Sequence, residues 1–211
     1  MTIIALKQAK KHQIEVVFED ESVFLDKETA LKNGLKVGQN FSSEQIEELK
    51  YSSELTRATS KAMWLLGRRE YSKKEMFLRL KQDKFDENAV SEAVETLAEA
   101  GVIDDERFAY NFAYNLKVNR KLGKRSIITE LCLKGVSREI AEITAEEFCD
   151  DEVSSAAEII RLKYPLFASD EKIKRRMIAA LQRKGYSYNV IREATDLVQN
   201  QETDEDCVRD F

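Results

Sequence analysis

A chain of 211 residues with 34 basic and 39 acidic side chains has a formal net charge of −5, which excludes a protein that is basic over its whole surface. The hydrophobic fraction of 43% is that of an ordinary folded protein, and one proline and seven glycines leave little room for long irregular segments. No run approaches the roughly 18 apolar residues of a membrane span. The first residues also lack the apolar region and cleavage site of a secretory signal. We therefore expect a cytoplasmic protein with no membrane partner.

Three short segments rich in Ile, Val and Phe open the chain, at residues 2–6, 13–18 and 22–25. This composition predicts a small antiparallel sheet. Asp26 then caps a short helix that ends at Gly34, and Ser42 with Gln45 forms the capping-box pattern that opens another helix. That helical pattern continues to residue 66, with a possible break at 51–53. We expect residues 1–50 to form an N-terminal extension, either a cap on the following array or a second contact site.

From residue 56 to 200 the sequence repeats one helical unit three times. The strings KFDENAV, GVSREIA and GYSYNVI begin at Lys84, Gly135 and Gly185, so their spacings are 51 (135 − 84) and 50 (185 − 135) residues. Apolar residues recur four, seven and eight places before these starts: Leu80, Leu131 and Leu181; Phe77, Ile128 and Ile178; Met76, Ile127 and Met177. Spacings of three and four residues are typical of helices.

The junction inside each unit has the sequence of a tight turn between two helices. Gly135 and Gly185 suit the left-handed residue that ends a helix, and Ser137 and Ser187 can cap the next helix. Lys84 replaces the glycine in the first copy, at a cost of about 1 kcal/mol if it is left-handed. We therefore predict a mainly α fold of nine helices in three tandem three-helix repeats, over residues 56–103, 104–150 and 151–200, followed by an acidic flexible tail at 201–211.

Catalytic and metal-binding patterns are missing from the sequence. The single histidine, His12, has no plausible metal or nucleophile partner, and no phosphate-loop motif occurs. Gly123 and Lys124 precede a helix and could accept one phosphate, but an isolated pair is a weak signal. The three cysteines have no metal-ligand spacing and are expected to be reduced thiols. The sequence thus predicts a protein that is not an enzyme and needs no cofactor or metal.

Basic residues gather around the start of the middle helix of every repeat. They are Arg68, Arg69, Lys73, Lys74 and Arg79 in the first repeat, Lys117, Arg120, Lys121, Lys124 and Arg125 in the second, and Lys172, Lys174, Arg175 and Arg176 in the third. In a stacked array such clusters would lie along one side. They indicate a binding face for a nucleic-acid backbone or an acidic protein groove, the alternative being a solvated face without a partner.

Aromatic residues at helical spacing are expected in the core: Trp64, Phe77, Phe85, Phe108, Phe112 and Phe148. Tyr71, Tyr110 and Tyr114 are left open, because stacking on nucleic-acid bases would require them to be exposed beside the basic clusters.

Residues 65–115 contain a leucine pair before R-R-E-Y-S and, further on, the pattern L-x-x-x-G-x-I-D-D-x-R-F-A. This combination resembles the signature region of the bacterial RecX proteins. Its positions here include Arg69, Glu70, Tyr71, Ser72, Glu75, Leu80, Leu97, Gly101, Ile103, Asp104, Asp105, Arg107, Phe108 and Ala109. The resemblance covers the first repeat and the opening of the second, and the three-repeat pattern extends it to about residue 200.

The resemblance implies a fold and a function. The fold is an elongated, curved rod of tandem three-helix repeats. The function is protein binding in RecA regulation: such a rod lies in the groove of the RecA filament on DNA, inhibits ATP hydrolysis and strand exchange, and favours filament disassembly. This implies a role in homologous recombination, DNA repair and the SOS response, with single- or double-stranded DNA as a further partner. We expect a monomer. A helical DNA-binding module that acts independently of RecA, and a general scaffold, remain as alternatives.

Overall fold

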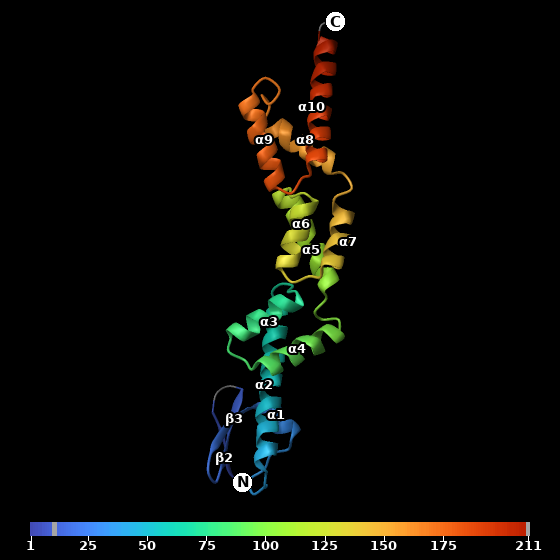
Figure 1. Cartoon of the computed structure of the whole chain (residues 1–211). Coiled ribbons are helices and arrows are strands. Elements are labelled where there is room, and N and C mark those ends of the chain that lie inside the picture. Colours follow the sequence, from blue (N-terminus) through green and yellow to red (C-terminus); the bar gives the residue numbers. More distant parts are fainter. Residues whose placement is uncertain (10–11, 210–211) are drawn as a thin grey trace. The chain divides into compact units, whose positions relative to one another are not determined.

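The computed structural model describes residues 1–9 and 12–209, and the side chains of residues 1–9 and 12–201 (Figure 1). Three strands and ten helices lie in this described part. The chain divides into two compact units, Met1–Asp104 and Asp105–Phe211. The predicted combination of a small N-terminal sheet with a mainly helical chain is confirmed.

The first unit opens with a three-stranded antiparallel sheet in the order β1-β2-β3, made of β1 (Ile3–Gln8), β2 (Gln13–Phe18) and β3 (Ser22–Asp26). The helix α1 (Lys27–Lys32) follows directly, and the Asp26 carboxylate accepts a hydrogen bond from the backbone N–H of Glu28. One face of the sheet, which includes Val16 and Leu25, is buried against the long helix that follows α1. The strands, the cap and the helix are as the sequence predicts.

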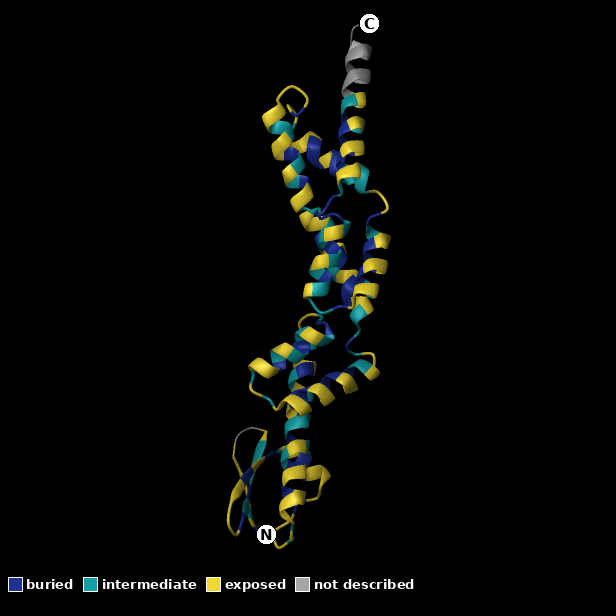
Figure 2. Cartoon of the chain, in the orientation of Figure 1, coloured by how far each residue is buried: buried dark blue, intermediate teal, exposed yellow. Residues whose placement is uncertain are grey.

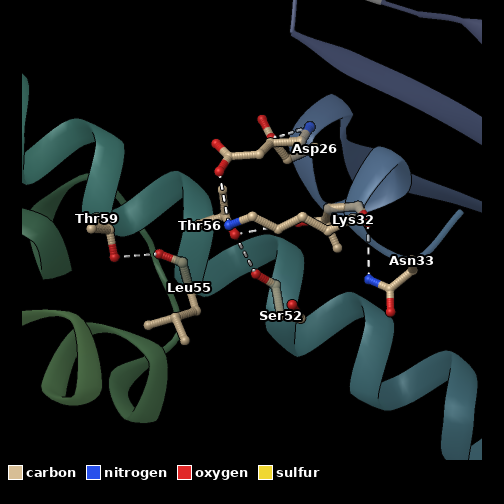
Figure 3. Close-up of polar contacts among 9 residues, drawn as sticks. Asp26, Lys32, Asn33, Ser52, Leu55, Thr56 and Thr59 are labelled. Carbon is tan, nitrogen blue, oxygen red and sulfur yellow. Dashed lines mark hydrogen bonds and ion pairs between the residues drawn. The ribbon is translucent and has the colours of Figure 1, made fainter. Parts of the chain in front are cut away.

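The helix α2 (Ser43–Leu66) is continuous through residues 51–53, where the sequence allowed a break. The hydroxyl of Ser53 is buried there and accepts a hydrogen bond from the backbone N–H of Asp26, at 2.5 Å. Figure 3 shows the same seam, in which Thr56 of α2 faces the segment that runs from Asp26 to Asn33. These polar contacts require a regular helix. The small residues that suggested a break therefore form part of the contact between α2 and the segment around α1.

Two hydrophobic cores divide the length of α2 between them. Ile46 and Leu49, in its first half, join the core of the sheet. Ala62 and Leu65, in its second half, join the core of the first repeat together with α3 (Lys73–Gln82) and α4 (Glu87–Glu99). A single helix thus belongs both to the N-terminal extension and to the first repeat.

The second unit contains two further three-helix sets. The first consists of α5 (Asp105–Arg120), α6 (Lys124–Leu133) and α7 (Arg138–Phe148). The second consists of α8 (Glu152–Lys163), α9 (Glu171–Arg183) and α10 (Tyr188–Arg209). Each set has its own hydrophobic core, and buried and exposed residues alternate around its helices (Figure 2).

The repeated apolar stripe is confirmed at two of its three positions, while the third, at Phe77, Ile128 and Ile178, is half-buried in every copy. Met76, Ile127 and Met177 are completely buried, as are Leu80, Leu131 and Leu181. The helix-ending residues also share one conformation, since φ is 65° at Lys84, 91° at Gly135 and 94° at Gly185. The 51- and 50-residue spacings therefore describe three structurally equivalent copies.

The sequence predicts a flexible acidic tail at residues 201–211, but the helix α10 continues to Arg209. Neither proline nor glycine follows Gly185, so nothing in the local sequence interrupts the helix. Residues 210 and 211, which belong to the same predicted tail, lie outside the described residues.

Candidate partner-binding surfaces

Two adjacent basic positions recur in all three repeats. Lys73, Lys124 and Lys174 are one period apart (124 − 73 = 51 and 174 − 124 = 50), and so are Lys74, Arg125 and Arg175. In α3 and α6 these residues open the helix, whereas α9 begins at Glu171 and holds them in its second turn. The first position is half-buried in every copy, and the second is exposed in every copy. The two positions must therefore be considered separately.

In the first two repeats the first basic position has a partner inside its own repeat. The Lys73 ammonium lies 3.8 Å from a carboxylate oxygen of Glu95, and Lys124 pairs in the same way with Glu146. The two glutamates are also one period apart (146 − 95 = 51). The hydrogen bond to Glu146 raises the pKa of Lys124 above its ordinary value. This position thus ties the start of the middle helix to the third helix.

The second basic position points toward solvent. Lys74 and Arg125 have no acidic partner within ion-pair distance among the described residues, and Arg175 pairs only with the exposed Glu171, at 3.4 Å. An exposed pair of this kind is worth roughly 0.2–1 kcal/mol, so a partner can replace it easily. We call Lys74, Arg125 and Arg175 the periodic basic residues.

The other basic residues predicted in the first repeat are held by contacts within the chain. The guanidinium of Arg68 lies 3.7 Å from the ring centroid of Trp64, and that of Arg69 lies 3.6 Å from the ring centroid of Tyr71. Arg79 forms an ion pair with Asp83, at 3.0 Å. Cations above aromatic rings are stabilised by the ring quadrupole, so these side chains already have favourable positions.

In the second repeat three predicted basic residues face inward or toward acidic neighbours. The Lys117 ammonium is buried and has no hydrogen-bond partner among the described residues. Arg120 pairs with Glu130 at 3.4 Å, and Lys121 pairs with Glu158 of the third repeat. In the third repeat Lys172 and Arg176 are exposed, while Lys174 is half-buried.

The second and third repeats meet at the N-terminus of α6, beside the second basic cluster. The backbone N–H of Gly123 donates to the carbonyl of Lys184 at 2.8 Å, and the Tyr186 hydroxyl donates to the carbonyl of Lys121 at 3.2 Å. The Lys184 ammonium donates to the carbonyl of Arg120 at 2.5 Å, and burial lowers the pKa of Lys184. Part of the second basic cluster is therefore engaged in joining two repeats.

The N-terminus of α6 already holds an anion from the chain itself. The Glu152 carboxylate accepts a hydrogen bond from the backbone N–H of Lys124, at 2.7 Å. A Cβ on Gly123 would lie 2.8 Å from the same carboxylate oxygen and 2.9 Å from the backbone of Gly185. The idea that Gly123 and Lys124 accept a phosphate is therefore wrong, because a carboxylate and a neighbouring turn fill that space.

Aromatic residues divide between core and surface differently from the prediction. Phe108 is buried, whereas Phe77, Phe85, Phe112 and Phe148 are half-buried at the edges of their cores. Trp64 is 50% exposed, so its prediction as a core residue is wrong. The buried stripe of α2 passes through Ala58, Ala62 and Leu65, and a residue directly before Leu65 points away from that stripe.

The three tyrosines left open by the sequence differ in exposure. Tyr71 is buried beneath Arg69. Tyr110 and Tyr114 are 51% and 53% exposed, and the ring of each lies close to that of Phe148. Both belong to α5 and meet α7, and Tyr110 lines an open cavity of about 460 Å³ together with Ile143 and Glu147.

The cysteines and acidic residues form no reactive site in the described part of the chain. Burial raises the pKa of the Cys149 thiol to about 11, which makes it a poor nucleophile near neutral pH. Among the described residues no group of three or more histidine, cysteine, aspartate and glutamate side chains could hold a metal ion. No helix among them is long and apolar enough to cross a membrane. The side chain of Cys207 lies outside the described residues.

Three equivalent helical sets with a recurring basic position define a tandem helical-repeat protein that acts through its surface. Comparison with family models assigns each set in order: residues 58–97 match RecX, first three-helix domain; residues 104–144 match the second; and residues 150–195 match the third. The chain belongs to the RecX family of regulatory proteins. These proteins are regulatory and not enzymatic, as the sequence predicts.

Curated relatives and solved structures agree with this assignment. The chain is 32% identical over 143 residues to the regulatory protein RecX of Chlorobium phaeobacteroides strain BS1, a match that covers 67% of this chain and 93% of that protein. It is 25% identical to RecX of Bacillus subtilis strain 168, with 100% and 81% covered. A crystal structure of regulatory protein RecX has a TM-score of 0.73 at 16% identity, covering 92% of this chain and 98% of that one. RecX from Lactobacillus salivarius has a TM-score of 0.65 at 19% identity, covering 70% and 98%.

Proposed function

We propose that this protein binds RecA filaments assembled on DNA and modulates them. It lies in the filament groove, mainly inhibits ATP hydrolysis and strand exchange, and favours disassembly of the filament. The observation that carries the proposal is the match to all three RecX three-helix domains in order, over residues 58–195. It acts in the cytoplasm as a monomer, and DNA in the filament is a second partner.

The periodic basic residues support a partner that is itself periodic. Lys74, Arg125 and Arg175 repeat along the chain at spacings of 51 (125 − 74) and 50 (175 − 125) residues, each exposed on the middle helix of its repeat. A filament of identical subunits presents the same acidic groups at regular intervals, and so does a nucleic-acid backbone. Complementary charges of this kind guide association and fix the register of two partners more than they raise affinity. We assign these three residues to the contact with the filament.

The direct test measures ATP hydrolysis by RecA on single-stranded DNA. The purified protein, added in substoichiometric amount, should slow hydrolysis, because one molecule in the groove acts on several subunits. Strand exchange should slow in parallel, and filaments should shorten in light scattering or electron microscopy. A protein that leaves hydrolysis unchanged at every ratio to RecA would contradict the proposal.

A second function, DNA binding without RecA, is favoured by one specific feature. Lys172, Arg175 and Arg176 are all exposed on the first half of α9, and within the part of the chain that the structure describes they form only the weak ion pair of Arg175. Binding dominated by phosphates loses affinity steeply as salt is raised, with a slope that reports the number of phosphates neutralised. Absence of binding to DNA at low salt and without RecA would rule this function out.

A further inference from the structure

An open cleft of about 730 Å³ lies within the first unit, between the N-terminal extension and the first repeat. The extension contributes His12, from the turn between β1 and β2, and Lys27 and Leu31 from α1. The first repeat contributes Arg57 and Trp64 from α2, and Phe85 from the turn between α3 and α4. Neither part of the unit would form this cleft alone.

The cleft exposes apolar side chains that an ordinary surface would cover. Trp64 is 50% exposed and Leu31 is 69% exposed, while Phe85 is half-buried behind them. Tryptophan is usually well buried in folded proteins, and neighbouring exposed apolar side chains mark interaction sites. The exposed tryptophan thus indicates a ligand with a flat or apolar surface.

Three cations surround these aromatic rings. Arg68 lies 3.7 Å and Lys61 4.9 Å from the centroid of the Trp64 ring, and Arg57 lies 5.5 Å from the centroid of the Phe85 ring. Two acidic residues, Asp26 and Glu28, also line the cleft, but both are engaged within the chain, since Asp26 caps α1 and Glu28 pairs with Lys32 at 2.8 Å. Asp83 pairs with Lys61 at 3.2 Å. Figure 3 shows Asp26 and Lys32 among the contacts of this region. Arg57 lines the cleft and forms no ion pair among the described residues, so its charge is available to a ligand.

We propose that this cleft binds single-stranded nucleic acid, with an unpaired base stacked on Trp64 and an adjacent phosphate near Arg57. An aromatic platform beside basic side chains is the usual means of holding single strands without sequence preference, because every base has a flat face and every nucleotide a phosphate. A duplex cannot occupy the site in this way, since its bases are stacked on each other.

An apolar side chain of a protein partner fits the same cleft less well. Covering Trp64 with a purely apolar group would remove water from Arg57 without giving its charge a partner, which is costly. A nucleotide supplies both an apolar face and a compensating anion. The charges around the ring thus select a nucleic acid over a hydrophobic peptide.

The chain provides its own probe, because Trp64 is its only tryptophan. The full-length protein should be titrated at low salt, without RecA, with a thymidine oligonucleotide of about 16 nucleotides, which spans the site sizes of single-strand grooves. Stacking should quench the tryptophan fluorescence as the oligonucleotide binds. A duplex of the same length should leave the emission of Trp64 unchanged. Absence of quenching by the single strand overturns the proposal.

Variants separate stacking from general electrostatic attraction. The anisotropy of a fluorescein-labelled thymidine oligonucleotide should show binding by Trp64→Ala weakened about tenfold, because stacking on one base is worth about 1–3 kcal/mol. Trp64→Phe should bind nearly as well as the unchanged protein. The matched control is Met63→Ala, since Met63 is 49% exposed on the same helix but does not line the cleft. Circular dichroism should confirm that all three variants are folded.

Equal affinity of Trp64→Ala and the unchanged protein would show that the oligonucleotide binds elsewhere, and would also overturn the proposal. The measurement contains no RecA. Its failure therefore leaves the proposed action on RecA filaments intact, and failure of the RecA experiment leaves this site intact.

Discussion

The backbone N–H of Gly123 donates a hydrogen bond to the carbonyl oxygen of Lys184, 2.8 Å away, although the two residues are 61 (184 − 123) positions apart. The contact sets the start of α6 against the turn between α9 and α10. Each side of the contact has a glycine, Gly123 on one and Gly185 on the other. A Cβ on Gly185 would overlap the backbone nitrogen of Ser126. The second and third repeats therefore meet backbone to backbone, and a side chain at either glycine would separate them.

A methyl group at Gly185 should be costly for two reasons. Gly185→Ala introduces a Cβ at a residue with φ of 94° and places it against Ser126. Left-handed strain costs about 1–2 kcal/mol and overpacking a further 1–3 kcal/mol, so we expect a loss of about 3 kcal/mol in the stability of the second unit. Denaturant unfolding followed by circular dichroism measures this loss, and hydrogen exchange should show faster opening of α6 and α9.

Two other glycines provide the controls for that substitution. Gly101→Ala meets nothing within 4 Å but shares the strain, with φ of 68°, and should cost only about 1 kcal/mol. Gly123→Ala has an extended backbone but meets Glu152 and Gly185, so it isolates the effect of crowding. If Gly185→Ala were no worse than Gly101→Ala, the two repeats would not be held by this contact.

The first repeat can be stabilised at its own turn. Lys84 has φ of 65°, in the position that glycine fills in the other two copies. Lys84→Gly should raise the free energy of unfolding by up to about 1 kcal/mol, because glycine adopts this conformation without steric cost. Thermal unfolding measures the gain. Lys84→Ala removes the charge but keeps the Cβ, so it should bring no gain; an equal gain would assign the effect to charge.

Stability should fall at alkaline pH because of Cys149. Burial raises the pKa of this thiol from 9.0 to about 11. Lys117 and Lys124 lower the pKa, and Glu146 and Glu152 raise it, each by less than burial does. Between these two values the unfolded chain loses its proton first, so stability falls as pH rises from about 9 to 11 and is unaffected by this group below that range. The loss is at most about 3 kcal/mol, since each pKa unit corresponds to about 1.4 kcal/mol.

Cys149→Ala tests the alkaline loss. The variant should show a flatter dependence of unfolding free energy on pH between about 9 and 11. Some dependence should remain, because burial also raises the pKa of Tyr186 in the same unit. Identical pH profiles of the variant and the unchanged protein would show that the thiol does not contribute.

Charge reversal at the periodic basic residues should weaken action on RecA without unfolding the protein. Exposed charge pairs contribute roughly 0.2–1 kcal/mol each, so Lys74→Glu, Arg125→Glu and Arg175→Glu together should raise the concentration needed to slow ATP hydrolysis by about tenfold or more. The matched control reverses three other exposed basic residues, Lys7, Lys36 and Arg192. Equal effects of the two triple variants would mean that net charge, and not position, determines binding.

The repeat and its turns could be predicted because their causes are local. Helical spacing predicted the buried places of Met76 and its equivalents, and a missing Cβ predicted the left-handed conformation of Gly135 and Gly185. At Lys84 the alignment predicted the turn but left the conformation open, and φ of 65° shows that this residue is left-handed too. The three strands were recognised for the same reason, since each consists of a short run of β-forming residues.

The junction between repeats could not be predicted because it depends on distant residues. Gly123 has the same local sequence whether a helix start receives a phosphate or lies against another backbone, and only the approach of Glu152 and Lys184 decides between them. One hint was present. Gly123 stands one period after Ser72, which caps α3 with its side chain, so the equivalent helix α6 has no side-chain cap. Trp64 was misplaced because a tryptophan fits either edge of an apolar stripe.

The continuous α2 gives the chain a folding boundary that differs from the boundary of its first RecX domain. The match to the first RecX domain begins at residue 58, inside a helix that runs from Ser43 to Leu66. A truncation at residue 58 would remove Ile46 and Leu49 from the helix that also carries Ala62 and Leu65. Loss of the sheet would therefore fray the helix on which the first repeat is assembled. The extension and the first repeat must therefore fold as one, although the match to the first RecX domain covers only residues 58–97.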